Sequence, residues 1–186
     1  MTFLKHALIL LLLVAVVGIA IMYSGIYNVS AEYPHPGIFK WFLDTTMERS
    51  VENHAKGVEA PADLDSPAMV QTGVKEFHED CAGCHGAPGK EPAPPGKNML
   101  PEPPDLKEAG EEMSPGEIYW VIKHGVRMTG MPAWGPHLED KELWSLVALI
   151  KQFPEMTPQQ YQALVAKAKQ QKEKEPGKEK GREKQQ

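Results

Sequence analysis

The two cysteines of this chain constrain its fold more than any other feature. They are Cys81 and Cys84, and His85 follows the second directly. Two thiols at this spacing can form thioethers with the two vinyl groups on one edge of a haem, while the adjacent imidazole coordinates the iron. The stretch therefore predicts covalent attachment of one haem c, with His85 as an axial ligand.

Two alternatives use the same residues. A zinc site needs four ligands, and the sequence has no second cysteine pair to complete one. A thioredoxin-like redox pair should follow a strand in a βαβ pattern, and no such strand is visible. A dithiol or a metal site is thus the weaker interpretation of the motif.

An apolar run begins at residue 7 and extends to about residue 27, close to the roughly 20 residues that cross a bilayer. Lys5 precedes the run, and the next basic residue is Lys40, so the N-terminus is expected to stay inside. Residues 1–27 are predicted to be a transmembrane anchor. The alternative is a cleaved signal peptide, with small residues at 29–31. Either way the cysteine motif faces the periplasm or the cell exterior.

Residues 28–64 form a predicted juxtamembrane connector that contains one amphipathic helix over 37–56. Its first turns are crowded with large apolar side chains, and charged residues follow. Aromatic residues just beyond a span suit the lipid headgroup level, so this helix is expected to lie on the membrane or on a membrane partner. The simpler alternative is that it covers the haem domain, and both remain open here.

Two further helices are predicted to pack on each other. The first begins at Ser66-Pro67 with a capping residue and a proline at its first position, and it runs into the cysteine motif. Gly73 indicates close approach of another helix, because glycine otherwise costs a helix about 1 kcal/mol. The expected partner spans 139–153 and carries an apolar stripe, and its Trp144 could lie in the notch at Gly73.

The segment between these helices has two parts. Residues 86–106 are rich in proline and glycine and are predicted to be a non-helical loop around a haem edge. Ser114 opens a capping box with proline at the next position, so a helix is expected from there to Gly125. Its Tyr119 and Trp120 either line the haem pocket or belong to the core.

A second axial ligand is expected in the loop 126–135. Gly130 and Pro132 bracket Met131, giving a backbone that can approach closely on one side and is extended on the other. A thioether sulfur suits low-spin haem and raises its reduction potential. Met131 is therefore the predicted ligand, and Met128 is its main rival. A bis-histidine site using His124 or His137 is a minor alternative, and His78 is expected to be a solvated surface residue.

The pattern Gly73-x-x-x-Phe77-x-x-x-Cys81-x-x-Cys84-His85, the later Met131-Pro132 pair and a closing helix with Leu143-Trp144 resemble the class I cytochrome c family. It is most similar to single-haem, membrane-anchored bacterial members, which implies that the anchor lies in a bacterial inner membrane. The resemblance covers residues 65–155 and implies an all-α class I cytochrome c fold around one covalent haem. It also implies that a loop carbonyl accepts the His85 Nδ1 hydrogen, and that Leu106 and Trp134 pack on the haem.

The resemblance implies an electron carrier and not an enzyme, because two filled axial positions leave no place for substrate. The implied partners are respiratory redox proteins: a haem-copper oxidase, a cytochrome bc complex or a dehydrogenase. A fixed subunit of such a complex is the alternative, and a haem enzyme or gas sensor with a labile sixth ligand is a further one.

Charge is unevenly distributed along the chain. Residues 65–155 carry eight basic and fifteen acidic side chains, a net of −7, which argues against nucleic acid as a partner. Residues 156–186 carry eight basic and four acidic side chains, a net of +4. This last segment is predicted to open with a capping box at Thr157 and a short helix, and residues 172–186 are predicted to be disordered.

Overall fold

The computed structural model describes residues 2–174, and the chain divides into two units, 1–34 and 35–186. Within the described residues every regular element is helical, and only an isolated bridge pairs Ala87 with Lys90 in β fashion. The predicted all-α fold is therefore confirmed.

The first unit contains α1, Thr2–Ser24, a helix of 23 residues. Its length and composition are sufficient to cross a membrane, and no residue in it is buried by the rest of the protein. Apolar side chains that remain exposed along a whole helix are those expected of a segment that faces lipid. The predicted N-terminal apolar helix is present.

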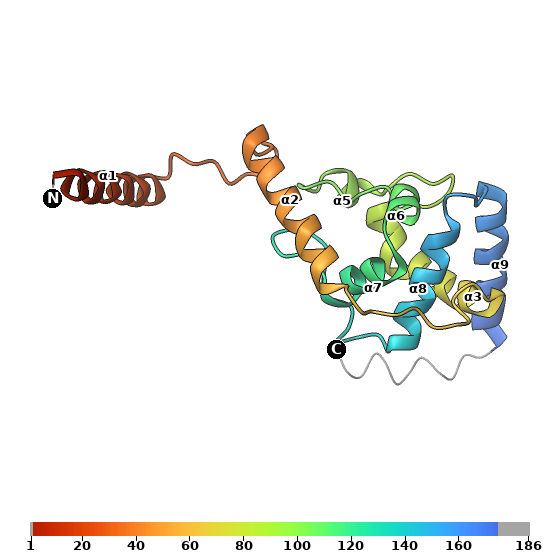
Figure 1. The fold of residues 1–186 in the computed structure, drawn as a ribbon. Coiled ribbons are helices and arrows are strands. Elements are labelled where there is room, and N and C mark those ends of the chain that lie inside the picture. The colour runs from red at the N-terminus through yellow and green to blue at the C-terminus, as the bar shows by residue number, and fades with distance from the viewer. Residues whose placement is uncertain (1, 175–186) are drawn as a thin grey trace. The chain divides into compact units, whose positions relative to one another are not determined.

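The core of the second unit forms where α3, Pro67–Glu76, crosses α8, Asp140–Gln152 (Figure 1). A Cβ atom on residue 73 would lie only 2.0 Å from the carbonyl oxygen of Ser145, so Gly73 is needed for the crossing. The predicted close approach is confirmed, but the prediction that Trp144 fills the notch is wrong. A backbone group occupies it, because the space is too narrow for an indole, and Trp144 instead stacks on Tyr119 with ring centroids 4.3 Å apart.

The predicted start of α3 is also present. The Ser66 side chain accepts a hydrogen bond from the Met69 amide, and Pro67 occupies the first turn, where its missing N–H is not needed. After Glu76 the chain continues through a π-helical turn, Phe77–Cys81, into the one-turn helix α4, Ala82–His85. The cysteine motif is therefore carried directly on the end of a core helix.

Three helices follow the motif: α5 Pro94–Lys97, α6 Leu106–Glu112 and α7 Pro115–His124. The one-turn helix α5 corrects the expectation of a wholly non-helical loop over 86–106, because prolines are tolerated in a first helical turn. The capping box at Ser114 is confirmed: Ser114 accepts from the Glu117 amide, and the Glu117 carboxylate accepts from the Ser114 amide. Gly125, with φ of +66°, follows the last residue of α7.

The connector helix α2, Gly37–His54, packs against α7. Val51 and Ala55 are buried, and a Cβ on Gly116 would lie 2.7 Å from the Val58 carbonyl oxygen. The C-terminal half of the connector helix therefore covers the haem domain, as one of the two interpretations expected.

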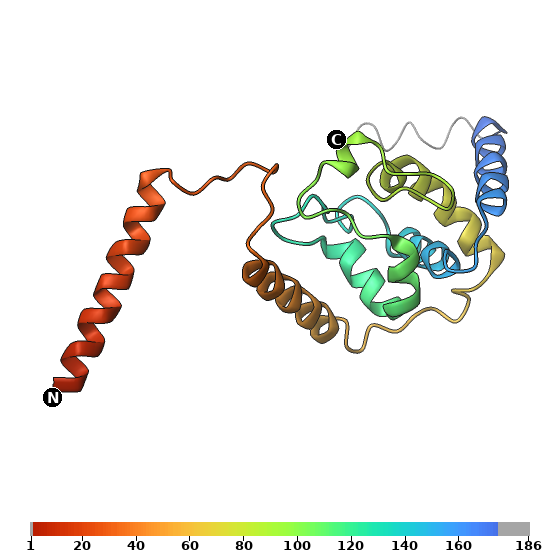
Figure 2. The same cartoon turned by 90° about the horizontal axis from the view of Figure 1, so that it is seen from above.

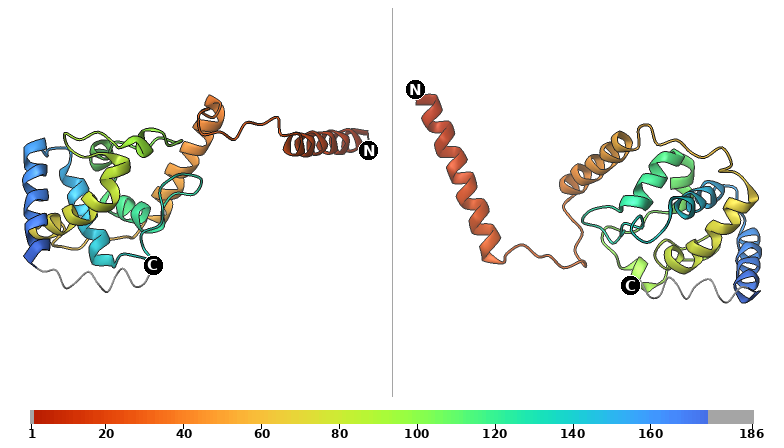
Figure 3. Two further views of the ribbon diagram at one scale, coloured as in Figure 1. Left: turned by 180° about the vertical axis from the view of Figure 1, so that it is seen from behind. Right: turned by 90° about the horizontal axis from the view of Figure 1, so that it is seen from below.

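The last helix, α9 Pro158–Lys174, lies beside α3 (Figures 2 and 3). Its Tyr161 is fully buried, and its ring meets Phe77 and Phe153 edge to face. The capping box at Thr157 is present, through reciprocal hydrogen bonds with Gln160. Residues 172–174, predicted to be disordered, continue this helix, and the remainder of that predicted tail lies outside the described residues.

Candidate haem-binding site

The thiols of the motif lie where the π turn meets α4. Cys81 and Cys84 are both free and half-buried. Burial, reinforced by the nearby Asp80 carboxylate and the second thiol, raises the pKa of Cys81 to about 12. Before any bond is formed, Cys81 is therefore a neutral thiol at neutral pH, which is compatible with its packing against the apolar core.

The segment after the motif closes tightly over it. The Ala93 amide donates to the Gly83 carbonyl oxygen at 2.9 Å. A Cβ on Gly96, in α5, would lie 2.4 Å from the carbonyl oxygen of Cys84. The proline-rich segment is thus held against the backbone of the motif at Gly83 and Cys84.

His85 has a defined orientation. Its Nδ1 lies 3.1 Å from the carbonyl oxygen of Pro104, and a carbonyl only accepts, so Nδ1 carries the hydrogen. In the neutral imidazole Nε2 then has a free lone pair, which is the state that binds a metal. Burial lowers the pKa of His85, with the hydrogen bond to Pro104 opposing, and so favours the neutral ring.

The two candidate methionines differ in the loop between α7 and α8. Met131 is half-buried and packs against the core, whereas Met128 is 75% exposed and adopts a left-handed backbone with φ of +61°. The Thr129 hydroxyl donates to the Val126 carbonyl at 2.7 Å and accepts from the Met131 amide at 3.0 Å. This turn directs the two side chains differently, and only Met131 lies against the core.

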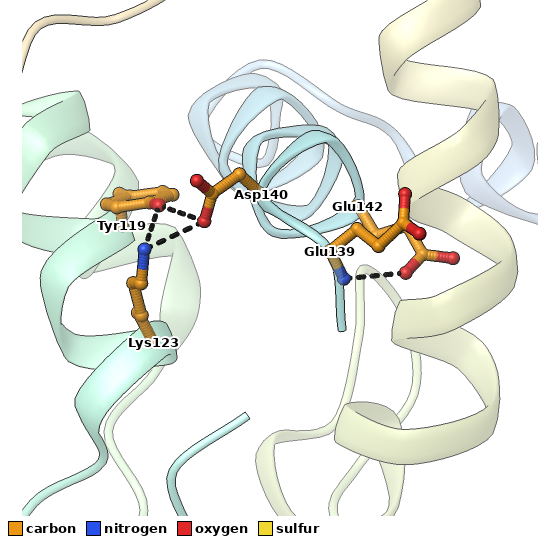
Figure 4. A network of polar contacts seen from close by, with 5 residues as sticks. All are labelled: Tyr119, Lys123, Glu139, Asp140 and Glu142. Carbon is orange, nitrogen blue, oxygen red and sulfur yellow. Dashed lines mark hydrogen bonds and ion pairs between the residues drawn. The ribbon is translucent and has the colours of Figure 1, made fainter. Parts of the chain in front are cut away.

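Both ends of this loop are fixed. The Trp134 amide donates to the Ile122 carbonyl at 3.1 Å, which folds the loop back onto α7. Between α7 and the start of α8, Tyr119 donates to Asp140 at 2.6 Å, and Lys123 donates to Asp140 at 2.8 Å and to Tyr119 at 2.9 Å (Figure 4). The Lys123 hydrogen bond, with a second from Tyr119, lowers the pKa of Asp140.

The remaining candidates fall into two groups. Leu106 and Trp134 are half-buried and contact the same core as Cys81 and Met131. The three alternative histidines lie elsewhere: His124 and His137 are exposed, and His78 is half-buried with its Nδ1 3.5 Å from the Tyr161 hydroxyl. His78, expected to be a solvated surface residue, is therefore only partly solvated, because α9 packs beside it.

Two residues beside the ligand loop were not anticipated from the sequence. Thr129 holds the turn, as described above, and its position two residues before Met131 was the one available signal. Met99 lies over the loop: a Cβ on Gly130 would be 2.6 Å from its sulfur atom. That contact joins segments 31 residues apart and had no local signal.

The donor set fits haem c. Residues 2–174 hold no group of three or more His, Cys, Asp or Glu side chains that could bind a metal ion by themselves. Haem brings four nitrogen ligands of its own and requires one ligand on each face, and an oriented imidazole and a thioether on the core are suited to those two positions. The crossing of α3 and α8, with this motif following α3, is the arrangement of a class I c-type cytochrome.

Comparison with known proteins agrees with this class. Residues 68–150 match the family described as cytochrome C oxidase, cbb3-type, subunit III. The chain is 36% identical over 84 residues to the cbb3-type cytochrome c oxidase subunit FixP of Rhizobium meliloti (strain 1021), covering 45% of this chain and 27% of that protein. It is 31% identical over 113 residues to the subunit FixPc of Rhizobium leguminosarum bv. viciae, covering 60% of this chain and 37% of that protein.

The chain therefore spans well under half the length of these two relatives. No solved structure gives a significant match. The matched region contains the motif and both core helices, and it supports a class I c-type cytochrome domain over residues 68–150. A domain of this family implies haem c as cofactor.

Proposed function

We propose that this protein is a membrane-anchored electron carrier with a single haem c. Cys81 and Cys84 bind the haem covalently, and His85 and Met131 are its axial ligands. The observation that carries the proposal is the orientation of His85, whose Nδ1–H donates to the Pro104 carbonyl. That contact leaves Nε2 available directly beside two thiols at the spacing of haem attachment.

When bound, haem supplies an iron that alternates between Fe(II) and Fe(III). The chain supplies the conditions for that exchange. The Pro104 carbonyl fixes the ring of His85 and makes it more basic, and the Thr129 turn holds Met131 against the core. With a side chain on each face, no position remains for substrate, so we assign no catalytic residue.

The proposed partners are respiratory redox proteins, with a haem-copper oxidase of the cbb3 type favoured because both relatives are named as subunits of one. A fixed subunit of such an oxidase is the second candidate, and the same observation favours it. In either case α1 anchors the chain in a bacterial inner membrane with the haem domain outside the cytoplasm. The net charge of −7 over residues 65–155 suits a partner with a basic docking surface.

Replacing each methionine in turn tests the ligand assignment. Met131→Ala is expected to lower the reduction potential, because a soft neutral ligand that favours Fe(II) is lost, and to let cyanide bind the ferric protein. Met128→Ala is the matched control and should change neither property, since its side chain is exposed. Redox titration measures the reduction potential, and the Fe–S charge-transfer band reports whether the methionine sulfur is bound or has been lost to cyanide. Equal changes in the two variants would refute Met131 as the ligand.

Detergent extraction and a salt series separate the carrier from the fixed subunit. A free carrier should be purified alone, and its rate of electron transfer to the isolated oxidase should fall as salt screens the acidic domain. A fixed subunit should be extracted within a complex and transfer electrons at a rate that salt does not change.

A further inference from the structure

The connector helix α2 presents two different sides. Its inner side packs on the haem domain through Val51 and Ala55, which are 4% and 8% exposed. One turn before Val51, Met47 is already 39% exposed, and residues 37–42 are exposed, so the packed side of α2 lies mainly at its C-terminal end. The inner side alone therefore accounts for the attachment of α2 to α7.

The outer side of α2 is apolar at its N-terminal end. Ile38, Phe39, Trp41 and Phe42 are 71%, 58%, 63% and 59% exposed. Ile38, Phe39 and Phe42 lie on the side of the helix opposite Val51, and Trp41 lies beside them, about 80° around the axis from Val51. We call these four residues the apolar patch. Beyond it the exposed surface becomes polar, as at Arg49, which pairs with Glu52 at 2.8 Å. An exposed cluster of this kind in a protein marks an interaction site and not a core.

Chain length limits where this patch can lie. Residues 25–36 join the end of α1 to the start of α2, and an extended chain covers at most about 3.3–3.6 Å per residue, so about 43 Å for these twelve residues. If α1 spans a bilayer, the patch is tethered within reach of the same bilayer's surface. Beyond Phe42 the exposed surface of α2 is largely polar, with Met47, 39% exposed, as the exception among its large apolar side chains. The continuous exposed apolar part is therefore about one and a half turns long, too short to bind along a long partner helix.

We propose that the apolar patch inserts into the headgroup region of the lipid bilayer that α1 crosses. Tryptophan and phenylalanine are favoured at that depth, and a short apolar face with polar residues beyond it can lie in the plane of the interface. Lys40 lies between the residues of the patch in the sequence, and its positive charge is neutralised by an ion pair with Asp44. Because α2 is also packed on α7, this contact sets how the haem domain faces the membrane.

The proposal rests on the proposed membrane anchor, and lipid-borne photolabelling tests the two separately. The full-length holoprotein is reconstituted in phosphatidylcholine–phosphatidylglycerol vesicles that contain a diazirine-modified lipid, and labelled residues are mapped by peptide mass spectrometry. We expect label in α1 and in residues 38–42, and none in residues 46–56. Label in α1 alone would overturn the patch proposal and leave the anchor intact. No label in α1 would overturn the anchor itself.

A water-borne carbene reagent, applied to the same vesicles, distinguishes lipid from protein contact. The patch should be protected from it, whereas the exposed residues Arg49, Glu52 and Asn53 should be labelled. Protection from both reagents would mean that a protein covers the patch, and would overturn the lipid assignment.

A paired substitution provides the control. Trp41→Ser with Phe42→Ser should reduce lipid-borne labelling of residues 38–42 several-fold, while Thr45→Ser with Thr46→Ser should not. Both variants should keep the wild-type haem spectrum, because neither pair lies on the inner side of α2. Unchanged labelling in the first variant would overturn the proposal.

Discussion

The Nδ1 atom of His85 lies 3.1 Å from the carbonyl oxygen of Pro104, and the next residue, Asp105, caps α6 by accepting a hydrogen bond from the Lys107 amide. The cap and the histidine contact thus share one stretch of backbone. Loosening the start of α6 should loosen the group that orients the proximal ring.

Replacing Asp105 tests this link. Asp105→Ala is expected to destabilise the protein by about 1 kcal/mol, the usual cost of losing an N-cap. It should also raise the reduction potential, because a less firmly hydrogen-bonded imidazole donates less to Fe(III). Asp105→Asn removes the same negative charge but keeps a capping oxygen, so the difference between the two variants isolates the cap. Thermal unfolding measures the loss of stability, and redox titration measures the change in potential. Identical reduction potentials in the two variants would contradict a connection between the cap of α6 and the orientation of His85.

Gly73 should tolerate no larger residue. In Gly73→Ala the new Cβ would collide with the Ser145 carbonyl and push α3 away from α8, at a cost of about 1–3 kcal/mol, despite the better helix propensity of alanine. Gly83→Ala is a matched control inside the motif, where nothing lies within 4 Å of the new atom. Denaturant unfolding of both variants measures the effect, and equal stabilities would argue against the close crossing.

Thr129 is expected to be a positioning residue for Met131. Thr129→Val removes both hydrogen bonds of its turn, so the Fe–S charge-transfer band should weaken and cyanide should bind faster. Thr129→Ser keeps the hydroxyl and should behave as wild type. If Thr129→Val kept the wild-type Fe–S charge-transfer band and the wild-type rate of cyanide binding, Thr129 would not position Met131.

Asp140 should make stability depend on acid pH. Its pKa is lowered by hydrogen bonds from Lys123 and Tyr119, so the folded state binds the proton less readily than the unfolded state. The contribution of Asp140 to the free energy of unfolding is therefore fully present above its ordinary pKa of 3.8. It is lost as the pH falls through the lower pKa of the folded state. Asp140→Asn should be less stable than wild type at pH 7, and the difference in melting temperature should shrink below about pH 4. A constant difference would show that Asp140 does not act through its charge.

Tyr161 should attach α9 to the haem domain. Its ring is fully buried against Phe77, just before the motif, so Tyr161→Ala should cost about 3–5 kcal/mol. The exposed neighbour Gln162 is the control, and Gln162→Ala should have little effect. If chemical denaturation gave equal stabilities for the two, α9 would not be part of this core.

The features predicted correctly from the sequence are the ones decided by neighbouring residues. The caps at Ser66, Ser114 and Thr157 each depend on a side chain and a backbone amide three residues apart, so the pattern alone identifies them. The same holds for the motif, whose five residues carry their own chemistry. The haem assignments of Cys81 and His85 remain predictions, supported by family and geometry.

What the sequence could not show depends on distant partners. The sequence implied only that some carbonyl of the loop 86–106 accepts the His85 hydrogen, and the folded loop selects Pro104. Trp144 was the residue predicted for the notch at Gly73, but the geometry of the helix crossing places the backbone of Ser145 there. His78 seemed to be a surface residue because nothing near it in the sequence indicated that α9 would return to cover it.

The π-helical turn Phe77–Cys81 determines the direction in which the thiols point. Here the Ala82 amide donates to the Phe77 carbonyl, so the turn holds one residue more than an α-helical turn would. One residue corresponds to about 100° of rotation around a helix axis. Phe77 can therefore remain in the core while the cysteine motif is out of phase with α3. A chain with one residue deleted from this turn would keep the complete Cys-x-x-Cys-His motif. Its sulfur atoms would nevertheless face a different side of the domain.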